Sequence, residues 1–477
     1  MKIRRKGFDT ALSVILIILI TASVVQAVIL WTSQTAGNNT GYLSKSSTMN
    51  DATVIDELFK PYNMILSSGN GVEKLIIGPA NKDFAVLWEE AAAYLKDAFS
   101  AKSTTMDSNE WRSLYSKSAV IFEFKVNIRS ELLSWFMGTG KLPASDLSGV
   151  CKMALSYDEN KSGKMIVYIM DDADVHIFEM PFKNHDRQYF SKTVVANYAL
   201  KENISYTLGP GELVVVARDD LLLSGDGDTT AKYGLLLLKA PDALVIPDTE
   251  SQVYQRNIAN TLLSSERYSY ETDVTKNGTL TIANLNNIYS LDLNGYLEYE
   301  SKTAQDETIV KGNIKDAFVN ALKFIYNYNR RNLASSVNLF ISDIIENKGS
   351  YTFIFGYRIS GTAMVPVYID YKTTINGNPV KADDAIRIVS TGSTVLSAKW
   401  LIRQAEKLPG EIELSIQPDF TALNKLMLTI GDAQMKLIDV NPAYIVSSVD
   451  KSSGTRPIWV VTTNSEKRRY LYSDEVQ

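Results

Sequence analysis

The longest apolar run in the chain covers residues 11–31 and contains no charged side chain. It follows a basic start that carries Lys2, Arg4, Arg5 and Lys6. About 20 apolar residues in a helix cross the hydrocarbon core of a bilayer, where a helix satisfies its own backbone hydrogen bonds. Basic residues beside a span remain in the cytoplasm. The pattern therefore predicts a cytoplasmic tail (residues 1–10), one transmembrane helix (residues 11–31) and a large C-terminal part outside the cell.

A cleaved signal peptide is the alternative interpretation of the same run. Val25-Gln26-Ala27 fits the small-x-small pattern of a cleavage site, and a basic start also suits export. The apolar run continues through Leu30, however, whereas the apolar region of a signal peptide spans only about 7–15 residues. The sequence favours a retained anchor, and cleavage after Ala27 stays open.

Residues 32–50 are polar, rich in Ser, Thr, Gly and Asn, and have the composition of a linker. Apolar residues from Phe84 to Phe99 then recur at helical spacing, and residues 118–128 have the composition of a strand. A short helix is expected over residues 130–137, ended by Gly138. Further strands are expected on both sides of a turn at 171–174, at 212–217 and at 233–240. Residues 51–250 are therefore predicted to form a mixed α/β domain.

Sharp turn signals mark the chain after residue 250. The pairs Asn277-Gly278, Asn294-Gly295 and Asn376-Gly377 each lie between strand-like runs. Asn-Gly is the strongest two-residue hairpin signal, because a type I′ turn needs positive φ twice. The sequence predicts an antiparallel meander up to about residue 300, then a helix over residues 314–328, all within a middle α+β domain at 251–390.

Residues 391–477 are predicted to form a C-terminal α+β domain that begins with a helix at about 395–408. Its plan repeats that of the middle domain, since a strand with Tyr357 leads to one with Pro366, and a strand with Tyr444 leads to one with Pro457. Coincidence between two tyrosine-bearing strands is the alternative. The predicted fold class is α+β: a single N-terminal transmembrane helix followed by a multi-domain extracytoplasmic region of antiparallel sheets with packed helices.

Charge and cysteine content narrow the possible partners. The net charge is −5, and because the first ten residues carry +3, the remainder carries −8. An acidic exterior argues against nucleic acid or anionic lipid as its partner. The chain has a single cysteine, Cys151, so an intramolecular disulfide is excluded and the domains must depend on their cores, which suits bacterial export.

Catalytic motifs are missing from the sequence. The two histidines, His176 and His185, lack the spacing of a metal pair, and Cys151 is expected to be a buried, inert strand residue. Asp226 and Asp228 do not continue into an EF-hand pattern, so a turn is the preferred interpretation. A solvated turn is also preferred for the acidic cluster Asp171, Asp172 and Asp174, with surface calcium binding as the alternative. We therefore expect no enzyme activity, no metal and no cofactor.

Recognition is left as the expected activity, and the apolar run itself offers a contact surface. Ser23 and Ala27 are four residues apart, a small-xxx-small pair that lets two helix backbones approach closely. Gln26 beside them carries an amide that seeks a hydrogen bond within a membrane. These three residues are predicted to make helix–helix contacts; alternatively, Gln26 reaches water at the outer interface.

Several short segments, taken in order, resemble the YycH family of two-component-system regulators, of which this chain would be a divergent member. They are residues 58–65 (LFKPYNMI), 121–124 (IFEF), 295–299 (GYLEY), 355–357 (FGY), 365–368 (VPVY) and 457–459 (PIW). The resemblance also includes the basic-flanked span and the linker after it.

This resemblance implies a membrane-anchored, extracytoplasmic and non-enzymatic regulator from Gram-positive bacteria. Its partners would be a sensor histidine kinase that controls cell-wall metabolism (WalK/YycG-like) and a YycI-like protein. Contact would run through the transmembrane helix and the exterior domains, with the protein in the cell membrane, its N-terminus cytoplasmic and its bulk extracellular. The competing hypothesis is an extracytoplasmic ligand- or envelope-binding protein whose helix is a passive anchor.

Overall fold

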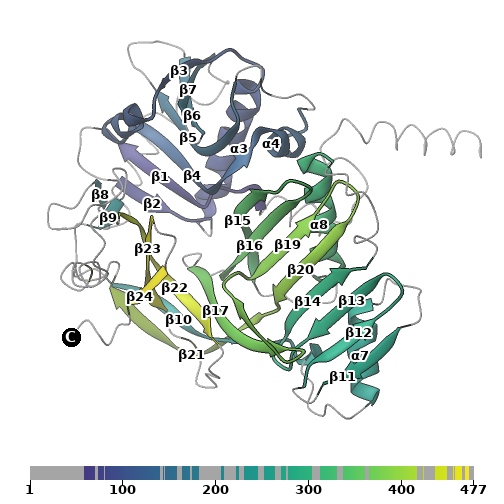
Figure 1. Cartoon of the computed structure of the whole chain (residues 1–477). Coiled ribbons are helices and arrows are strands. Elements are labelled where there is room, and N and C mark those ends of the chain that lie inside the picture. The colour runs from purple at the N-terminus through teal and green to yellow at the C-terminus, as the bar shows by residue number, and fades with distance from the viewer. Residues whose placement is uncertain are drawn as a thin grey trace, which may run out of the picture.

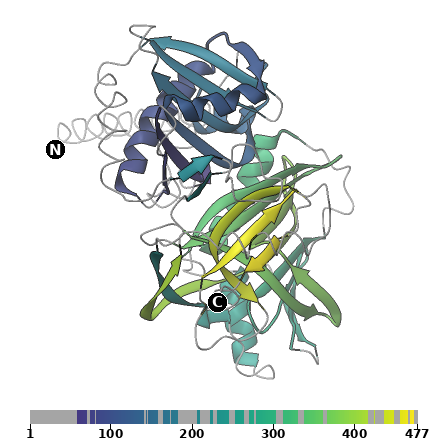
Figure 2. The same ribbon diagram turned by 90° about the vertical axis from the view of Figure 1, so that its left-hand side faces the viewer.

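A computed structural model gives the three-dimensional structure of the chain (Figure 1). It describes most of residues 58–471. Residues 1–57 and 472–477 lie outside the described part, as do 182–205, 209–221, 416–435 apart from Leu423, and several shorter segments. In the described part, two large β-sheets form two stacked lobes, the N-terminal one purple to blue and the C-terminal one teal to yellow (Figure 2).

The N-terminal lobe is built on a nine-stranded antiparallel sheet. Its strands lie in the order β3-β7-β6-β5-β4-β1-β2-β8-β9. Their bounds are Asn63–Ser68 (β1), Lys74–Ile77 (β2), Thr104–Asp107 (β3), Ser118–Arg129 (β4), Gly149–Tyr157 (β5), Lys164–Met170 (β6), Asp174–Pro181 (β7), Tyr206–Leu208 (β8) and Leu222–Ser224 (β9). The strands predicted at 118–128 and on both sides of 171–174 are confirmed as β4, β6 and β7. The strand predicted at 212–217 lies outside the described residues.

Helices cover both faces of this sheet. The predicted helix is α3, Lys82–Ala98, which buries Phe84, Leu87, Trp88 and other residues of its apolar face against β6 and β7. On the other face, the 3₁₀ helix η1 (Ser108–Ser116) buries Trp111 in a second, smaller core. The short helix α4, Ser130–Phe136, follows β4 directly. Gly138 ends it with a φ of 65°, a conformation that glycine adopts more readily than residues with a side chain.

The C-terminal lobe contains a thirteen-stranded sheet, whose main path runs β11-β12-β13-β14-β20-β19-β16-β17-β22-β23-β24. Its first strands form the predicted meander: Glu271–Val274 (β11), Leu280–Ala283 (β12), Asn287–Leu291 (β13) and Tyr296–Ser301 (β14). The others are Asn338–Glu346 (β15), Tyr351–Ile359 (β16), Val365–Ile375 (β17), Asn378–Ala382 (β18), Ile386–Ser390 (β19), Val395–Leu401 (β20), Leu437–Ser447 (β22), Ile458–Thr463 (β23) and Arg468–Leu471 (β24). β15 pairs with β16, and β18 pairs with β17.

The predicted helix at 314–328 is confirmed as α8, Ile314–Asn329, which packs on β16, β19 and β20. The residue before it caps it: Asn313 Oδ1 accepts the Asp316 backbone N–H at 2.8 Å, and the Asn313 amide donates to the Asp316 carboxylate at 2.7 Å. A further helix, α7 (Gln252–Leu263), packs near β11.

The helix predicted at about 395–408 is wrong. Residues 395–401 are strand β20, and residues 404–415 belong to strand β21. β20 is hydrogen-bonded to β14 on one side and to β19 on the other, and its Ala398 and Trp400 are buried while Lys399 between them is exposed. Partners on both edges thus override helix-like apolar spacing.

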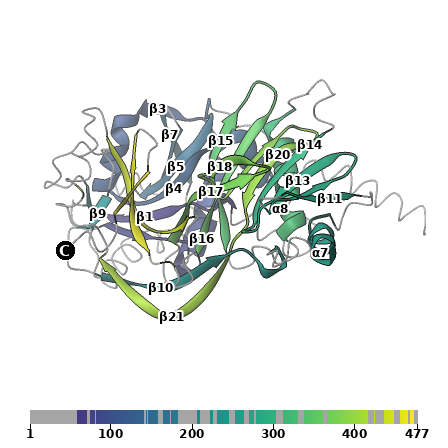
Figure 3. The same cartoon turned by 60° about the horizontal axis from the view of Figure 1, so that its bottom comes forward.

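The predicted repeat is preserved only in part. β16 and β17 pair antiparallel, as do β22 and β23, but the second copy lacks the expected helix at 395–408. β17 and β22 instead lie parallel to each other in the sheet, with Val367 beside Tyr444. Because β20 pairs with β14 and β19, residues on both sides of position 390 belong to one sheet. The predicted boundary between a middle and a C-terminal domain at 390/391 stays a prediction. The strand predicted at 233–240 is β10, Thr230–Lys239, which forms a separate two-stranded ribbon with β21, Gln404–Ser415, curving below the sheets (Figure 3).

Candidate functional site: the joint between the two sheets

The two lobes meet where β4 leaves its own sheet. Along β4, Glu123 lies opposite Lys152 of β5 and Ile128 lies opposite Val150, so residues 124–127 face only Cys151. β1 pairs with β4 no further than Glu123. This long bulge bends β4 toward β15 of the other sheet, as Figure 1 shows. The bulge thereby creates the joint, by which we mean the contact of β4, α4, Phe59 and Tyr62 with β15, β16, β22 and α8.

The charged end of the joint comprises Tyr62, Lys125, Phe340, Arg358 and Asp439. Lys125 Nζ donates to Asp439 Oδ2 at 2.8 Å, across 314 positions of sequence, and lies 4.7 Å from the centroid of the Tyr62 ring. The Arg358 guanidinium lies 5.1 Å from the Tyr62 ring and 4.8 Å from the Phe340 ring. Cations at these distances from aromatic rings gain about 0.5–2 kcal/mol each, so Tyr62 binds a cation from each lobe.

Electrostatics hold Tyr62 and Lys125 in their ordinary protonation states. Removal from water raises the pKa of Tyr62, and the nearby Lys125 only partly opposes the rise. For Lys125, loss of hydration lowers the pKa, but Asp439, together with Tyr368 and Tyr62, outweighs that loss and raises it. The Lys125–Asp439 pair is therefore ionic, although its side chains remain 28% and 24% exposed.

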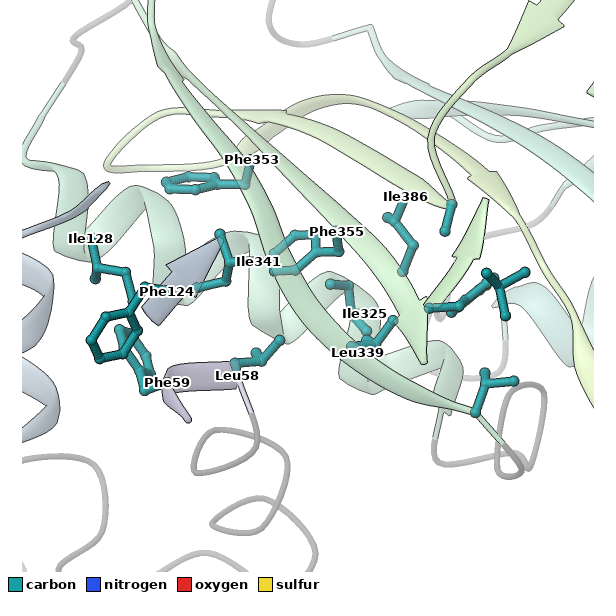
Figure 4. Close-up of a cluster of buried hydrophobic side chains, with 14 of the residues drawn as sticks. Leu58, Phe59, Phe124, Ile128, Ile325, Leu339, Ile341, Phe353, Phe355 and Ile386 are labelled. Carbon is teal, nitrogen blue, oxygen red and sulfur yellow. The ribbon is translucent and has the colours of Figure 1, made fainter. Parts of the chain in front are cut away.

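The aromatic end of the joint surrounds Phe318 of α8. Phe59 stacks on Phe136 with ring centroids 4.5 Å apart, and its edge meets Phe318 at 5.6 Å. Trp135 of α4 meets Phe318 at 6.2 Å. In Figure 4, Phe59, Phe124 and Ile128 of the N-terminal lobe lie beside Ile341 of β15. Phe59, Phe124, Ile128, Phe318 and Ile341 belong to one hydrophobic core that continues from lobe to lobe, and the partly buried Trp135 and Phe136 pack against it.

A buried polar cluster fixes the turn between β13 and β14. Asp292 Oδ1 accepts the backbone N–H groups of Asn294 and Tyr296 at 2.9 and 2.7 Å. Its Oδ2 accepts the hydroxyls of Tyr371 at 2.7 Å and Thr373 at 2.8 Å. Burial lowers the pKa of the neighbouring Arg403, whose guanidinium lies 5.2 Å from the Tyr371 ring. With both carboxylate oxygens occupied by protein donors, this cluster holds the turn in register and offers no reactive group.

His176 lies in β7 and is buried beside the buried Asp171 and the half-buried Ser103. Its Nε2 is 3.4 Å from Asp171 Oδ2, and its Nδ1 is 3.4 Å from Ser103 Oγ. Proton transfer in catalysis needs roughly 2.6–3.2 Å. Asp171 is also committed elsewhere, since it accepts the Asp174 backbone N–H at 2.8 Å and the Ser148 hydroxyl at 3.0 Å. Asp171 therefore stabilises the β6–β7 turn.

The structure corrects the prediction made for the acidic turn and shows a hydrogen bond of Cys151 that the sequence did not reveal. Asp171 is buried, so the prediction of a solvated acidic turn is wrong for it, while Asp174 is exposed. Cys151 is half-buried in β5 and its Sγ donates to Met170 O at 3.2 Å. Within the described residues, no three His, Cys, Asp or Glu side chains are placed to hold a metal ion. Asp172, His185, Asp226 and Asp228 lie outside the described residues.

The predicted contact residues of the span, Ser23, Gln26 and Ala27, lie outside the described residues, as do the topology residues Lys2, Arg4, Arg5 and Lys6. No helix in the described part of the chain combines the length and apolar character needed to cross a membrane. Those site assignments and the localisation stay predictions.

Comparisons with known proteins give one informative result. No protein-family model matches the chain, and no curated protein matches it. Among solved structures, the crystal structure of YycH from Bacillus subtilis superposes with a TM-score of 0.53 at 12% sequence identity, over 88% of this chain and 97% of that one. The chain has a YycH-like fold. The resemblance inferred from short segments is thereby confirmed at the level of fold.

Three of those segments contribute to the joint of this YycH-like fold, and one of them, residues 121–124, supplies Phe124. Phe59 and Tyr62 lie in residues 58–65, and Gly356, beneath the Phe340 ring, lies in residues 355–357. Sequence reasoning missed Lys125, Arg358 and Asp439, because nothing local distinguishes these charges from those of any solvated strand. The only available signal was Tyr62, a large aromatic residue directly before β1.

Proposed function

We propose that the chain is a membrane-anchored extracytoplasmic regulator of a two-component sensor histidine kinase that controls cell-wall metabolism. The YycH-like fold, over almost the whole length of YycH, is the observation that carries this proposal. Residues 11–31 serve as the single span, with the N-terminus in the cytoplasm and the lobes outside. A YycI-like protein is the second partner, and the action is by contact, without a reaction or cofactor.

A regulator shifts a kinase only by binding one of its signalling states more tightly than the other. The Ser23–Ala27 face of the span, with Gln26 beside it, is suited to this task. Small residues allow a partner helix to pack closely, and the Gln26 amide can form a hydrogen bond with that helix, which lipid chains cannot offer. We assign the differential contact to this face, and the orientation of the span to the two lobes.

In-membrane photocrosslinking tests the proposal. A photoreactive residue is placed at position 23 or 27, and the matched control is placed at Val25, on the opposite side of a helix. Adducts with a histidine kinase or a YycI-like protein from 23 and 27, but not from 25, are expected. Lipid adducts alone, together with capture of wall components from an exterior site, would instead support an envelope-binding protein with a passive anchor.

Kinase output provides the functional test. Ser23→Leu, Gln26→Leu and Ala27→Leu are combined in one variant, with Val25→Leu as the control. Larger side chains on the contact face keep the partner helix away, so output should change in the triple variant and not in the control. Unchanged output at normal protein levels would refute the assignment of this face.

A further inference from the structure

The two ends of the joint differ in chemistry. At the aromatic end, Phe318 is fully buried and touches Phe59 and Trp135 without any charged partner. At the charged end, the direct bond between lobes is the Lys125–Asp439 ion pair, to which water retains access. Salt screens exposed charges and leaves apolar burial intact. The exposed Arg129–Glu346 pair lies next to the aromatic end, but the packing of Phe59, Trp135 and Phe318 does not depend on charge, so salt should weaken the charged end more than the aromatic end.

Strand β4 spans the distance between the two ends. Lys125 contacts the charged end, and four residues later Arg129 forms an ion pair with Glu346 next to α4. Four strand residues separate these points by roughly 13 Å. Because residues 124–127 have no ladder partner in β1 or β5, the segment is held by its contacts with β15 of the other lobe and by the packing of Phe124 on Trp88 of α3 in its own lobe.

We propose that the joint is a latch, with a permanent pivot at the aromatic end and a releasable catch at the charged end. When Lys125 and Asp439 separate, Arg358 withdraws from Tyr62 and the lobes rotate about Phe318. The chain then has a closed arrangement and a hinged one. This property belongs to the lobes themselves and does not depend on the identity of any membrane partner.

The energies favour release at this end. Ion pairs that water can reach contribute little to stability, and each cation–aromatic contact adds a modest further amount. The pivot fully buries large aromatic side chains, among them Phe59 and Phe318, and the burial of each stabilises the contact considerably more. A disturbance of modest size therefore opens the catch long before it separates the pivot.

Hydrogen exchange measured by mass spectrometry on the full-length chain tests the latch. The variant Asp439→Asn should raise exchange up to about fivefold in peptides covering residues 120–129 and 337–346, since an ion pair that water can reach changes a local opening equilibrium by about that factor at most. Peptides of the meander at 280–291 should be unaffected. Salt at about 1 M, where the screening length is about 3 Å, should produce the same pattern in the unmodified chain.

Glu179→Gln is the matched control. It removes the Lys164–Glu179 pair, which joins β6 to β7 within one lobe, and it should leave residues 120–129 and 337–346 unchanged. If Asp439→Asn does not fold, Lys125→Met removes the same pair while keeping an apolar stem over Tyr62. Unaltered exchange at the joint in a folded variant would overturn the latch. A uniform increase over the whole chain would also overturn it, because the lobes would then not separate before global unfolding.

Discussion

The Phe340 ring lies directly over Gly356, its cross-strand neighbour in β16, so that an added Cβ at position 356 would stand 2.4 Å from the ring. The missing side chain lets Phe340 lie flat where it can contact both Tyr62 and Arg358. The joint between the two sheets therefore requires a glycine at position 356 of the C-terminal sheet.

The substitution Gly356→Ala should lower the free energy of unfolding by about 1–3 kcal/mol, the usual cost of overpacking. The displaced Phe340 ring should also disturb the Arg358 and Tyr62 contacts. Urea unfolding provides the measurement. Gly234→Ala in β10 is the control, because nothing lies within 4 Å of a Cβ there, and its stability should hardly change. Equal effects at the two positions would contradict the assigned role of Gly356.

Gly149→Ala should destabilise the bulge in β4. Its Cβ would lie 2.2 Å from Asn127 Oδ1 and 2.9 Å from the backbone oxygen of Ile128. The side chain of Asn127 can turn aside, but the Ile128 carbonyl cannot move without shifting β4. We expect a loss of about 1–3 kcal/mol in thermal or urea unfolding. Stability equal to that of the unmodified chain would contradict this prediction and would mean that β4 can shift at the bulge without loss of stability.

Asp292→Ala should be among the most damaging single changes in the C-terminal lobe. It leaves two backbone N–H groups and two hydroxyls without their acceptor, and it removes a negative charge that favours the charged form of Arg403. Breaking one side of a buried charged cluster costs about 3–5 kcal/mol. Calorimetry would measure the loss, with the exposed Asp242→Ala as the control. A loss below about 1 kcal/mol would show that water replaces the carboxylate.

Tyr371→Phe should alter how stability depends on pH. Burial, together with the charge of Asp292 and the hydrogen bond to it, raises the pKa of Tyr371 to about 12 from an ordinary 10.0. The unfolded chain therefore releases this proton first, and the native state holds more protons between about pH 10 and pH 12. Stability contributed by Tyr371 is complete below pH 10 and is lost as the pH rises through 12.

The stability difference between the unmodified chain and Tyr371→Phe should consequently narrow over that interval. Urea unfolding at a series of pH values measures it. Burial likewise raises the pKa of Tyr444 to about 12, so Tyr444→Phe should behave in the same way. A difference that is constant from pH 9 to pH 12 would show that the hydroxyl of Tyr371 ionises at the same pH in the folded and unfolded chains.

Local signals in the sequence determined many elements of the fold. At Asn376-Gly377 both φ angles are positive, at 49° and 82°, as a type I′ hairpin requires. The spacing of Phe84, Leu87 and Trp88 identified α3, and that of Ala317, Phe318 and Ala321 identified α8. These features depend on backbone sterics and side-chain period over a few residues, so a linear pattern contains them.

Only the tertiary structure decided which residues far apart in the chain contact one another. Residues 395–401 have helical spacing, yet the open edges of β14 and β19 make them a strand. Lys125 donates a hydrogen bond to Asp439, 314 positions away in the sequence. Phe340 lies opposite Gly356 only because β15 and β16 pair in one register. Hydrogen-bond partners, buried charges and close contacts depend on which surfaces meet, and a linear pattern does not record that. The sequence by itself therefore established the α+β class and the YycH-like resemblance, and only the folded chain revealed the joint.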